Sequence, residues 1–193
     1  MNQTYMKEKK IFPLVMSMAL PMMLSMAFNS LYNIVDSYFV AKLSEDAMTA
    51  LSLVYPAQNL LTAVAVGFGV GVNAMISFYL GAQNQEKADK TATQGIVLGV
   101  LHGVLLMLLF LCGMNWFLGM FTKSDAVRAL GMEYSNVVFL FSVIVTGGIT
   151  LEKIFQAVGR MRATMVSMIA GFVPNLVLDP LLIFGIGPFP RME

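Results

Sequence analysis

The chain has 193 residues, of which 58% are hydrophobic and 12% are charged, with a formal net charge of +1 and a mean hydropathy of +0.75. Soluble domains carry roughly 45–50% apolar and about 25% charged residues. The composition therefore excludes an ordinary soluble protein and indicates an integral membrane protein. Cys112 is the only cysteine, so an intrachain disulfide is also excluded.

Charged residues occur in clusters, and these divide the chain into five apolar segments at about 11–40, 48–80, 91–117, 129–151 and 163–186. Each segment exceeds the roughly 20 residues that cross the hydrocarbon core and is too long for barrel strands of about 9–11 residues. Because only helices and closed barrels span a membrane, the sequence predicts an all-α protein with five transmembrane helices. The first segment is longer than the apolar core of a signal peptide, so we expect a retained helix.

Basic residues predict the orientation of these helices. If the N-terminus is cytoplasmic, eight basic residues face the cytoplasm and four face outside, as the positive-inside rule requires. The cytoplasmic set is Lys7, Lys9, Lys10, Lys87, Lys90, Lys153, Arg160 and Arg162, and the outer set is Lys42, Lys123, Arg128 and Arg191. The sequence thus favours a multi-pass protein of a bacterial cell membrane.

Prolines and glycines within the apolar segments predict special backbone positions. Pro174 and Pro180 would free the carbonyls of Ala170 and Leu176, and a freed carbonyl at membrane depth can line a cavity or bind a cation. Small residues let helix backbones approach closely within a bilayer. We therefore expect helix packing at two sets of glycines, which are Gly95, Gly99 and Gly103 in the third segment and Gly67, Gly69 and Gly71 in the second.

Two isolated carboxylates lie inside apolar segments, Asp36 in the first and Asp179 in the fifth. A carboxylate in hydrocarbon is costly and usually serves an ion site, a proton relay or a substrate counter-charge. Each acid follows an asparagine by three or four residues, Asn33 and Asn175 respectively. This pattern predicts coupling of a cation to transport. The alternative is that the acids brace neighbouring helices through hydrogen bonds.

Polar residues at helical spacing extend this prediction. Three stripes should turn away from lipid and converge on a bundle interior: Ser25, Asn29, Tyr32 and Asp36, with Asn33 at the edge; Asn59, Thr62 and Asn73; and Asn175 with Asp179. Carboxylate, amide and carbonyl oxygens are the ligands that hard cations prefer. Asp36, Asn175 and Asp179 are therefore candidate ligands for Na⁺, and their carboxylates are candidate carriers of H⁺.

Other polar residues carry weaker predictions. His102 lies midway along the third segment, where it is either a proton relay or a neutral helix contact. Glu152, Lys153, Arg160 and Arg162 surround a short loop and are expected to set topology. Metal-ligand clusters, nucleophile motifs, phosphate loops and basic nucleic-acid patches are absent from the sequence. We therefore expect no enzymatic activity, no cofactor other than a coupling ion and no nucleic-acid partner.

Several motifs resemble the multidrug and toxic compound extrusion (MATE) family of transporters. They are LVMSMALPMM at 14–23, YNIVDSYFV at 32–40, ALSLVYP at 50–56, GFGVG at 67–71, LGAQ at 80–83, AVGRMRATM at 157–165 and NLVLDPLLIFG at 175–185. The resemblance is distributed over nearly the whole chain. It implies a secondary antiporter that exports cationic lipophilic compounds by alternating access, with Na⁺ or H⁺ as the coupling ion. It also implies that Asp36, Asn175 and Asp179 form the cation site of the N-terminal lobe.

The resemblance also implies that the chain is incomplete. Members of the family have twelve helices in two lobes of six, whereas residues 1–193 would form an incomplete N-terminal lobe of five. We therefore expect the missing C-terminal lobe to be a partner, together with membrane lipid, and the fragment alone to be inactive. Two alternatives remain: a lipid-linked saccharide flippase of the same superfamily, and an inactive membrane-embedded remnant.

Overall fold

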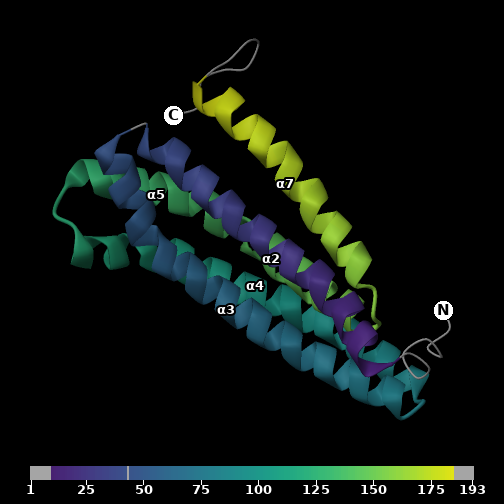
Figure 1. Cartoon of the computed structure of the whole chain (residues 1–193). Coiled ribbons are helices and arrows are strands. Elements are labelled where there is room, and N and C mark those ends of the chain that lie inside the picture. Colours follow the sequence, from purple (N-terminus) through teal and green to yellow (C-terminus); the bar gives the residue numbers. More distant parts are fainter. Residues whose placement is uncertain (1–9, 43, 185–193) are drawn as a thin grey trace. The chain divides into compact units, whose positions relative to one another are not determined.

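The computed structural model describes the backbone of residues 10–42 and 44–184, and the side chains of these residues other than Asn29, Tyr32, Asp36 and 175–184. All regular elements in this part are helices, as the sequence predicts. In chain order they are α2 (Ile11–Ala41), α3 (Glu45–Gly81), α4 (Gln85–Phe121), α5 (Asp125–Leu140), α6 (Ser142–Ala157) and α7 (Met161–Phe184) (Figure 1). The chain is thus an all-α membrane protein.

The helices belong to two compact units. Unit 1 comprises residues 1–39 and 159–193 and contains α2 and α7, whereas unit 2 comprises residues 40–158 and contains α3 to α6. By length and composition, three helices of the described part could cross a membrane: α2, α3 and α4. The pair α5 and α6 makes a fourth if it is a single bent span, and Met161–Pro174 in α7 is a shorter apolar stretch.

Polar caps make the helices of unit 2 longer than the apolar segments predicted. Ser44, Asn84 and Ser124 each accept a hydrogen bond from the backbone N–H three residues later, at 3.0, 3.0 and 3.4 Å. Such a cap satisfies an N–H that would otherwise lack a partner at the start of a helix. α3 and α4 have 37 residues each and are therefore about 55 Å long, which exceeds the roughly 30 Å hydrocarbon core.

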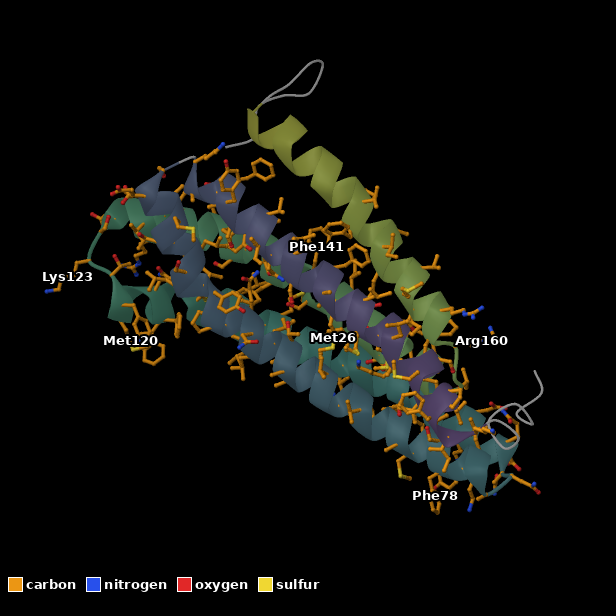
Figure 2. All side chains as sticks on the ribbon, viewed as in Figure 1. Met26, Phe78, Met120, Lys123, Phe141 and Arg160 are labelled. Atoms are coloured by element: carbon orange, nitrogen blue, oxygen red, sulfur yellow. The ribbon has the colours of Figure 1, made fainter. Side chains whose placement is uncertain are left out.

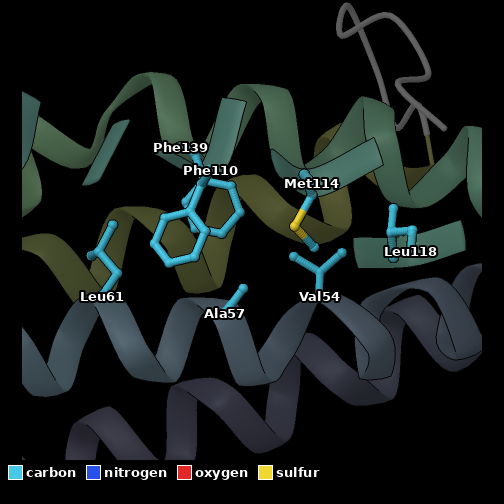
Figure 3. Close-up of a cluster of buried hydrophobic side chains, with 7 residues drawn as sticks. All are labelled: Val54, Ala57, Leu61, Phe110, Met114, Leu118 and Phe139. Atoms are coloured by element: carbon cyan, nitrogen blue, oxygen red, sulfur yellow. The ribbon is translucent and has the colours of Figure 1, made fainter. Parts of the chain in front are cut away.

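Hydrophobic residues fill the contact between α3, α4 and α5 (Figure 3). The buried cluster consists of Val54, Ala57, Leu61, Phe110, Met114, Leu118 and Phe139. The rings of Phe110 and Phe139 are stacked, with centroids 4.3 Å apart and planes inclined by 22°. A second, smaller cluster of Val72, Ile76 and Ala88 lies where α3 packs against the start of α4.

In Figure 2, Phe78 lies near one end of unit 2 and Lys123 near the other. The loop before α4 and the loop after it are therefore at opposite ends of unit 2.

The glycines of α4 pack as predicted. A Cβ atom on Gly95 would lie 2.7 Å from Val72 Cγ1 of α3, and one on Gly99 would lie 2.5 Å from Thr150 Oγ1 of α6. A Cβ on Gly103 would overlap the Thr146 hydroxyl and lie 2.8 Å from the Val143 Cα. These glycines therefore allow α4 to approach both α3 and α6 closely.

The expectation for α3 is confirmed in part. Among its three central glycines, Gly69 packs against Lys153, whereas a Cβ on Gly67 or on Gly71 would meet no atom of the described residues within 4 Å. The prediction of packing is thus confirmed for Gly69 and stays a prediction for the other two. Helical spacing accounts for the difference, because Gly67 and Gly71 are one turn apart on one face of α3 whereas Gly69 lies on the opposite face.

The fourth apolar segment is divided into two helices. α5 ends at Leu140 and α6 begins at Ser142, and the helix axes are inclined by 48°. Phe141 between them has φ −89° and ψ 6°, outside the ordinary helical range. The bend lies where the backbone of α6 comes closest to Gly103 of α4. It thus directs the start of α6 against α4.

We predict that Gly103→Ala lowers the melting temperature of the purified protein. The added methyl group would overlap the Thr146 hydroxyl and the backbone at Val143, and overpacking typically costs about 1–3 kcal/mol. Gly113→Ala on the same helix is the matched control, because its Cβ would meet no atom within 4 Å in the part of the chain that the structure describes. The control should be neutral or stabilising, since alanine is the better helix former. Equal melting temperatures for the two variants would contradict the packing described here.

Candidate functional site

The three candidate cation ligands lie in unit 1. Asp36 is on α2 and Asn175 and Asp179 are on α7, but their side chains lie outside the described residues. The backbone is helical at all three positions. Asn175 and Asp179 are therefore one turn apart and share a face of α7, as predicted.

An aromatic contact joins α2 to α7 within unit 1. The ring centroids of Phe28 and Phe172 are 5.6 Å apart, and the planes are inclined by 45°. Phe28 precedes Asp36 by two turns of α2, and Phe172 precedes Asp179 by about two turns of α7. The acids are therefore about 12 Å and about 10 Å along their helices from this contact. If the two helices run in the same direction, as the predicted topology requires, the acids lie at similar depth.

The remaining candidates on α2 are only partly described. Asn33 is exposed, and the side chains of Asn29 and Tyr32 lie outside the described residues. Ser25 on the same helix is buried and donates a hydrogen bond from its Oγ to the Pro21 carbonyl at 2.8 Å. This bond satisfies the hydroxyl within α2.

The three candidates on α3 differ in burial and in their hydrogen bonds. Asn59 and Thr62 are exposed on unit 2, and the Thr62 hydroxyl donates to the Gln58 carbonyl at 3.0 Å. Asn73 is half-buried and its Nδ2 donates to the Lys153 carbonyl of α6 at 2.8 Å. Asn73 thus faces α6 within unit 2, and the proposal that the three residues line a cavity stays a prediction.

A polar cluster next to Asn73 was not predicted from the sequence. The Glu152 Oε1 atom accepts hydrogen bonds from Gln156 Nε2 at 2.7 Å and from Lys153 Nζ at 3.2 Å. Lys153 Nζ also donates to Gln156 Oε1 at 3.3 Å. The side chains of Lys153 and Glu152 are 15% and 26% exposed, so the ion pair is largely shielded within the protein. We call Asn73, Glu152, Lys153 and Gln156 the polar clasp.

The polar clasp gives Glu152 and Lys153 contacts in addition to the topology role that the sequence predicts for them. Both residues lie within α6, and Lys153 packs against Gly69, about 18 Å along α3 from Gly81. Arg160 and Arg162 are exposed, and their role in topology stays a prediction. One sequence signal could have identified the clasp: Glu152 and Gln156 are spaced by four residues, which places them side by side on a helix.

His102 forms a helix contact, in agreement with the simpler of its two predicted roles. Its Nδ1 atom is 2.7 Å from the Leu98 carbonyl, and its ring centroid is 4.7 Å from that of Phe68. A carbonyl only accepts hydrogen bonds, so Nδ1 carries the hydrogen in this arrangement. The imidazole is thus held between its own helix and α3.

Comparisons with known proteins identify relatives over most of the chain. The family model described as MatE matches residues 21–181. The multidrug export protein MepA of Staphylococcus aureus (strain NCTC 8325 / PS 47) is 30% identical over 182 residues, which cover 94% of this chain and 40% of that protein. The chain thus spans about 40% of the length of the curated relatives that it matches.

Solved transporter structures share the fold. An outward-facing multidrug resistance MATE family transporter of the MOP superfamily has a TM-score of 0.86 and 27% identity, over 91% of this chain and 39% of its own. A MOP superfamily transporter from Pyrococcus furiosus, for which a reversed polarity of the binding pocket is described, has the same values.

Proposed function

The chain belongs to the MatE family, and from this premise we propose that it forms most of the N-terminal lobe of a secondary multidrug efflux antiporter. In this proposal an inward gradient of Na⁺ or H⁺ drives export of cationic lipophilic compounds. Members of the family are transporters and not enzymes. The observation that carries the proposal is the match to the family over residues 21–181, which include both intramembrane acids.

The coupling ion is proposed to bind at Asp36, Asn175 and Asp179. The two acids each lie about two turns beyond the Phe28–Phe172 contact, and Asn175 lies one turn beyond it. In the proposed topology α2 and α7 run in the same direction, so the acids would be at similar depth, which supports this site. Two carboxylates and an amide offer the oxygen ligands that Na⁺ requires, and either carboxylate can carry H⁺. Pro174 and Pro180 lie within α7 and lack the N–H that would bond the carbonyls of Ala170 and Leu176, which offers further oxygen ligands in this proposal.

A transport cycle needs a second lobe. Alternating access in secondary transporters is largely a rocking of one bundle against another around a central site. The chain spans about 40% of its relatives, so the partner in this proposal is the C-terminal lobe that the relatives contain. We refer to the chain joined to such a lobe as the complete transporter.

The first prediction concerns the coupling site. In the complete transporter, Asp179→Asn should reduce ion-driven export to background because it removes the charge and keeps the shape. Asp36→Asn should impair export in the same way, and Asn175→Ala should raise the ion concentration for half-maximal export roughly two- to tenfold, because one hydrogen-bonding oxygen is lost. Export of ethidium from loaded liposomes measures these effects.

Asp46→Asn is the matched control for the carboxylate variants. Asp46 lies in the first turn of α3 and is exposed, outside the apolar part of the helix. Its substitution should leave export unchanged. Wild-type export by the Asp179→Asn variant would disprove the assignment of the coupling site.

The second prediction concerns orientation in the cell membrane, for which we propose a cytoplasmic N-terminus. Single cysteines at Asp46 and Asp125 should react with a membrane-impermeant thiol reagent added to intact cells, because both lie in the first turn of a helix that starts at the proposed outer side. A cysteine at Gln85 should react only after the cells are opened. Labelling of Gln85→Cys from outside would contradict this orientation.

The third prediction is that residues 1–193 alone do not transport. Alternating access requires a second bundle that moves relative to the first around the site, and this chain supplies only one. Folding of unit 2 alone is therefore not sufficient for transport. Liposomes that contain only this chain should show no gradient-driven efflux of ethidium. Addition of the C-terminal lobe, fused or as a separate polypeptide, should restore efflux. Efflux by the short chain alone would indicate a functional homo-oligomer and contradict this prediction.

A further inference from the structure

One buried hydroxyl of unit 2 lies at the break between α5 and α6. Ser142, the first residue of α6, is 0% exposed, and its Oγ atom forms no hydrogen bond with any residue that the structure describes. Buried polar side chains are bonded in the large majority of cases, either to protein or to an ordered water. The hydroxyl of Ser142 therefore requires an explanation.

The other buried hydroxyls of α5 and α6 show the bond that Ser142 would ordinarily make. Ser135, Thr146 and Thr150 each donate to a backbone carbonyl three or four residues earlier, at 3.1, 3.2 and 2.9 Å. This is a common bond of a hydroxyl inside a helix, because the carbonyls of the preceding turn lie within its reach. Ser142 thus differs from three neighbours of the same chemistry and similar burial.

The bend removes the usual partners of Ser142. In a continuous helix its hydroxyl would bond the carbonyl of Val138 or of Phe139, and both of these residues lie in α5. The axis of α5 is inclined by 48° to that of α6, so these carbonyls no longer align with the first turn of α6. The hydroxyl is therefore left without the bond that its neighbours make.

The same bend frees a carbonyl two residues before Ser142. In a continuous helix the N–H of Ile144 would bond the carbonyl of Leu140. Here it donates to the Phe141 carbonyl at 3.0 Å, and the N–H of Val145 donates to the same oxygen at 3.1 Å. The Leu140 carbonyl has thus lost its usual helical donor.

A sharp bend in a helix has few causes. They are proline, a pair of glycine or serine residues, a π-bulge, and a side chain or a water molecule inserted between backbone groups. Residues 138–145 contain no proline, no glycine and only one serine. The two bonds to Phe141 span three and four residues, so this turn is not a π-bulge. An inserted water remains, and it would satisfy both the hydroxyl and the freed carbonyl.

We infer that the break between α5 and α6 binds one water molecule within unit 2. The Ser142 hydroxyl donates to the water, and the water donates to the Leu140 carbonyl. A buried water makes about two to four hydrogen bonds, so these two groups are sufficient partners. Packing against α4 sets the bend, and the water satisfies the polar groups that the bend leaves open. The site lies in unit 2 alone and does not depend on which ion drives transport.

The experiment detects the water directly in the complete transporter. A brief X-ray pulse converts water to hydroxyl radicals, which oxidise the side chains next to it. Phe139 lies one turn before Ser142 and is 0% exposed, so bulk water does not reach it. Met114 on α4 is 1% exposed and lies one turn from the stacked rings (Figure 3). It is the internal control, because its thioether oxidises readily wherever water enters.

Two variants make the same exchange at different hydroxyls. Ser142→Ala removes the proposed partner of the water. Ser135→Ala is the matched control, because Ser135 is 1% exposed and its hydroxyl is satisfied within α5. Mass spectrometry measures the oxidation of Phe139 and Met114 in the wild type and in both variants.

We expect oxidation of Phe139 in the wild type and in Ser135→Ala, and loss of most of this oxidation in Ser142→Ala. Met114 should stay unmodified in all three proteins. The inference would be overturned by an unmodified Phe139 in the wild type, or by undiminished oxidation of Phe139 in Ser142→Ala. Equal oxidation of Met114 and Phe139 would also overturn it, because bulk water would then be the source.

Melting temperatures test the inference in a second way. Removal of a buried hydroxyl that has no partner relieves an unpaired group, whereas removal of a bonded hydroxyl loses a hydrogen bond. We therefore expect Ser142→Ala to melt no higher than Ser135→Ala. A higher melting temperature for Ser142→Ala than for Ser135→Ala would show that no water satisfies the Ser142 hydroxyl.

Discussion

The close approach of α4 to α3 and α6 is the constraint on which unit 2 depends. Water does not drive helices together within a bilayer, so contact area and hydrogen bonds must do so. One face of α4 has no side chains at three successive turns, which are those of Gly95, Gly99 and Gly103. Val72 and two threonine hydroxyls pack directly against the backbone there. Both threonines satisfy their hydroxyls within α6, Thr146 at 3.2 Å to Val143 and Thr150 at 2.9 Å to Thr146. Close packing at these two positions therefore does not bury a hydroxyl without a hydrogen-bond partner.

The bend at Phe141 follows from the same constraint. α5 packs its bulky Phe139 against Phe110, whereas α6 must bring its backbone against Gly103. A single straight helix running alongside α4 would be either too close to accommodate the two stacked rings or too far away for backbone contact at Gly103. A change of direction by 48° at Phe141 allows α5 to lie on the aromatic part of α4 and α6 to lie on its glycine strip.

The sequence predicted those features that depend on one helix at a time. Apolar length identified the helices, and the spacing of Gly95, Gly99 and Gly103 identified a packing face, because helical periodicity alone determines both. The bend at Phe141 escaped prediction because neither proline nor glycine marks it, and its cause lies in α4. The bond from Asn73 to Lys153 escaped for the same reason. The spacing of polar residues on α3 predicts that Asn73 faces away from lipid. It does not predict which helix Asn73 contacts.

Glu152 and Asp179 differ in whether a basic side chain of the protein lies close enough to neutralise the carboxylate. Glu152 has an ammonium group on the next residue and an amide one turn later, so its charge is compensated within the protein. Asp179 has no basic residue nearby in the sequence, since the nearest are Arg162 and Arg191 at the two ends of its apolar segment. A carboxylate that is paired with a lysine side chain is already neutralised by the protein. A carboxylate without a basic side chain nearby favours binding of Na⁺ or H⁺. The same residue chemistry thus serves fixed structure in unit 2 and, in our proposal, exchangeable ion binding in unit 1.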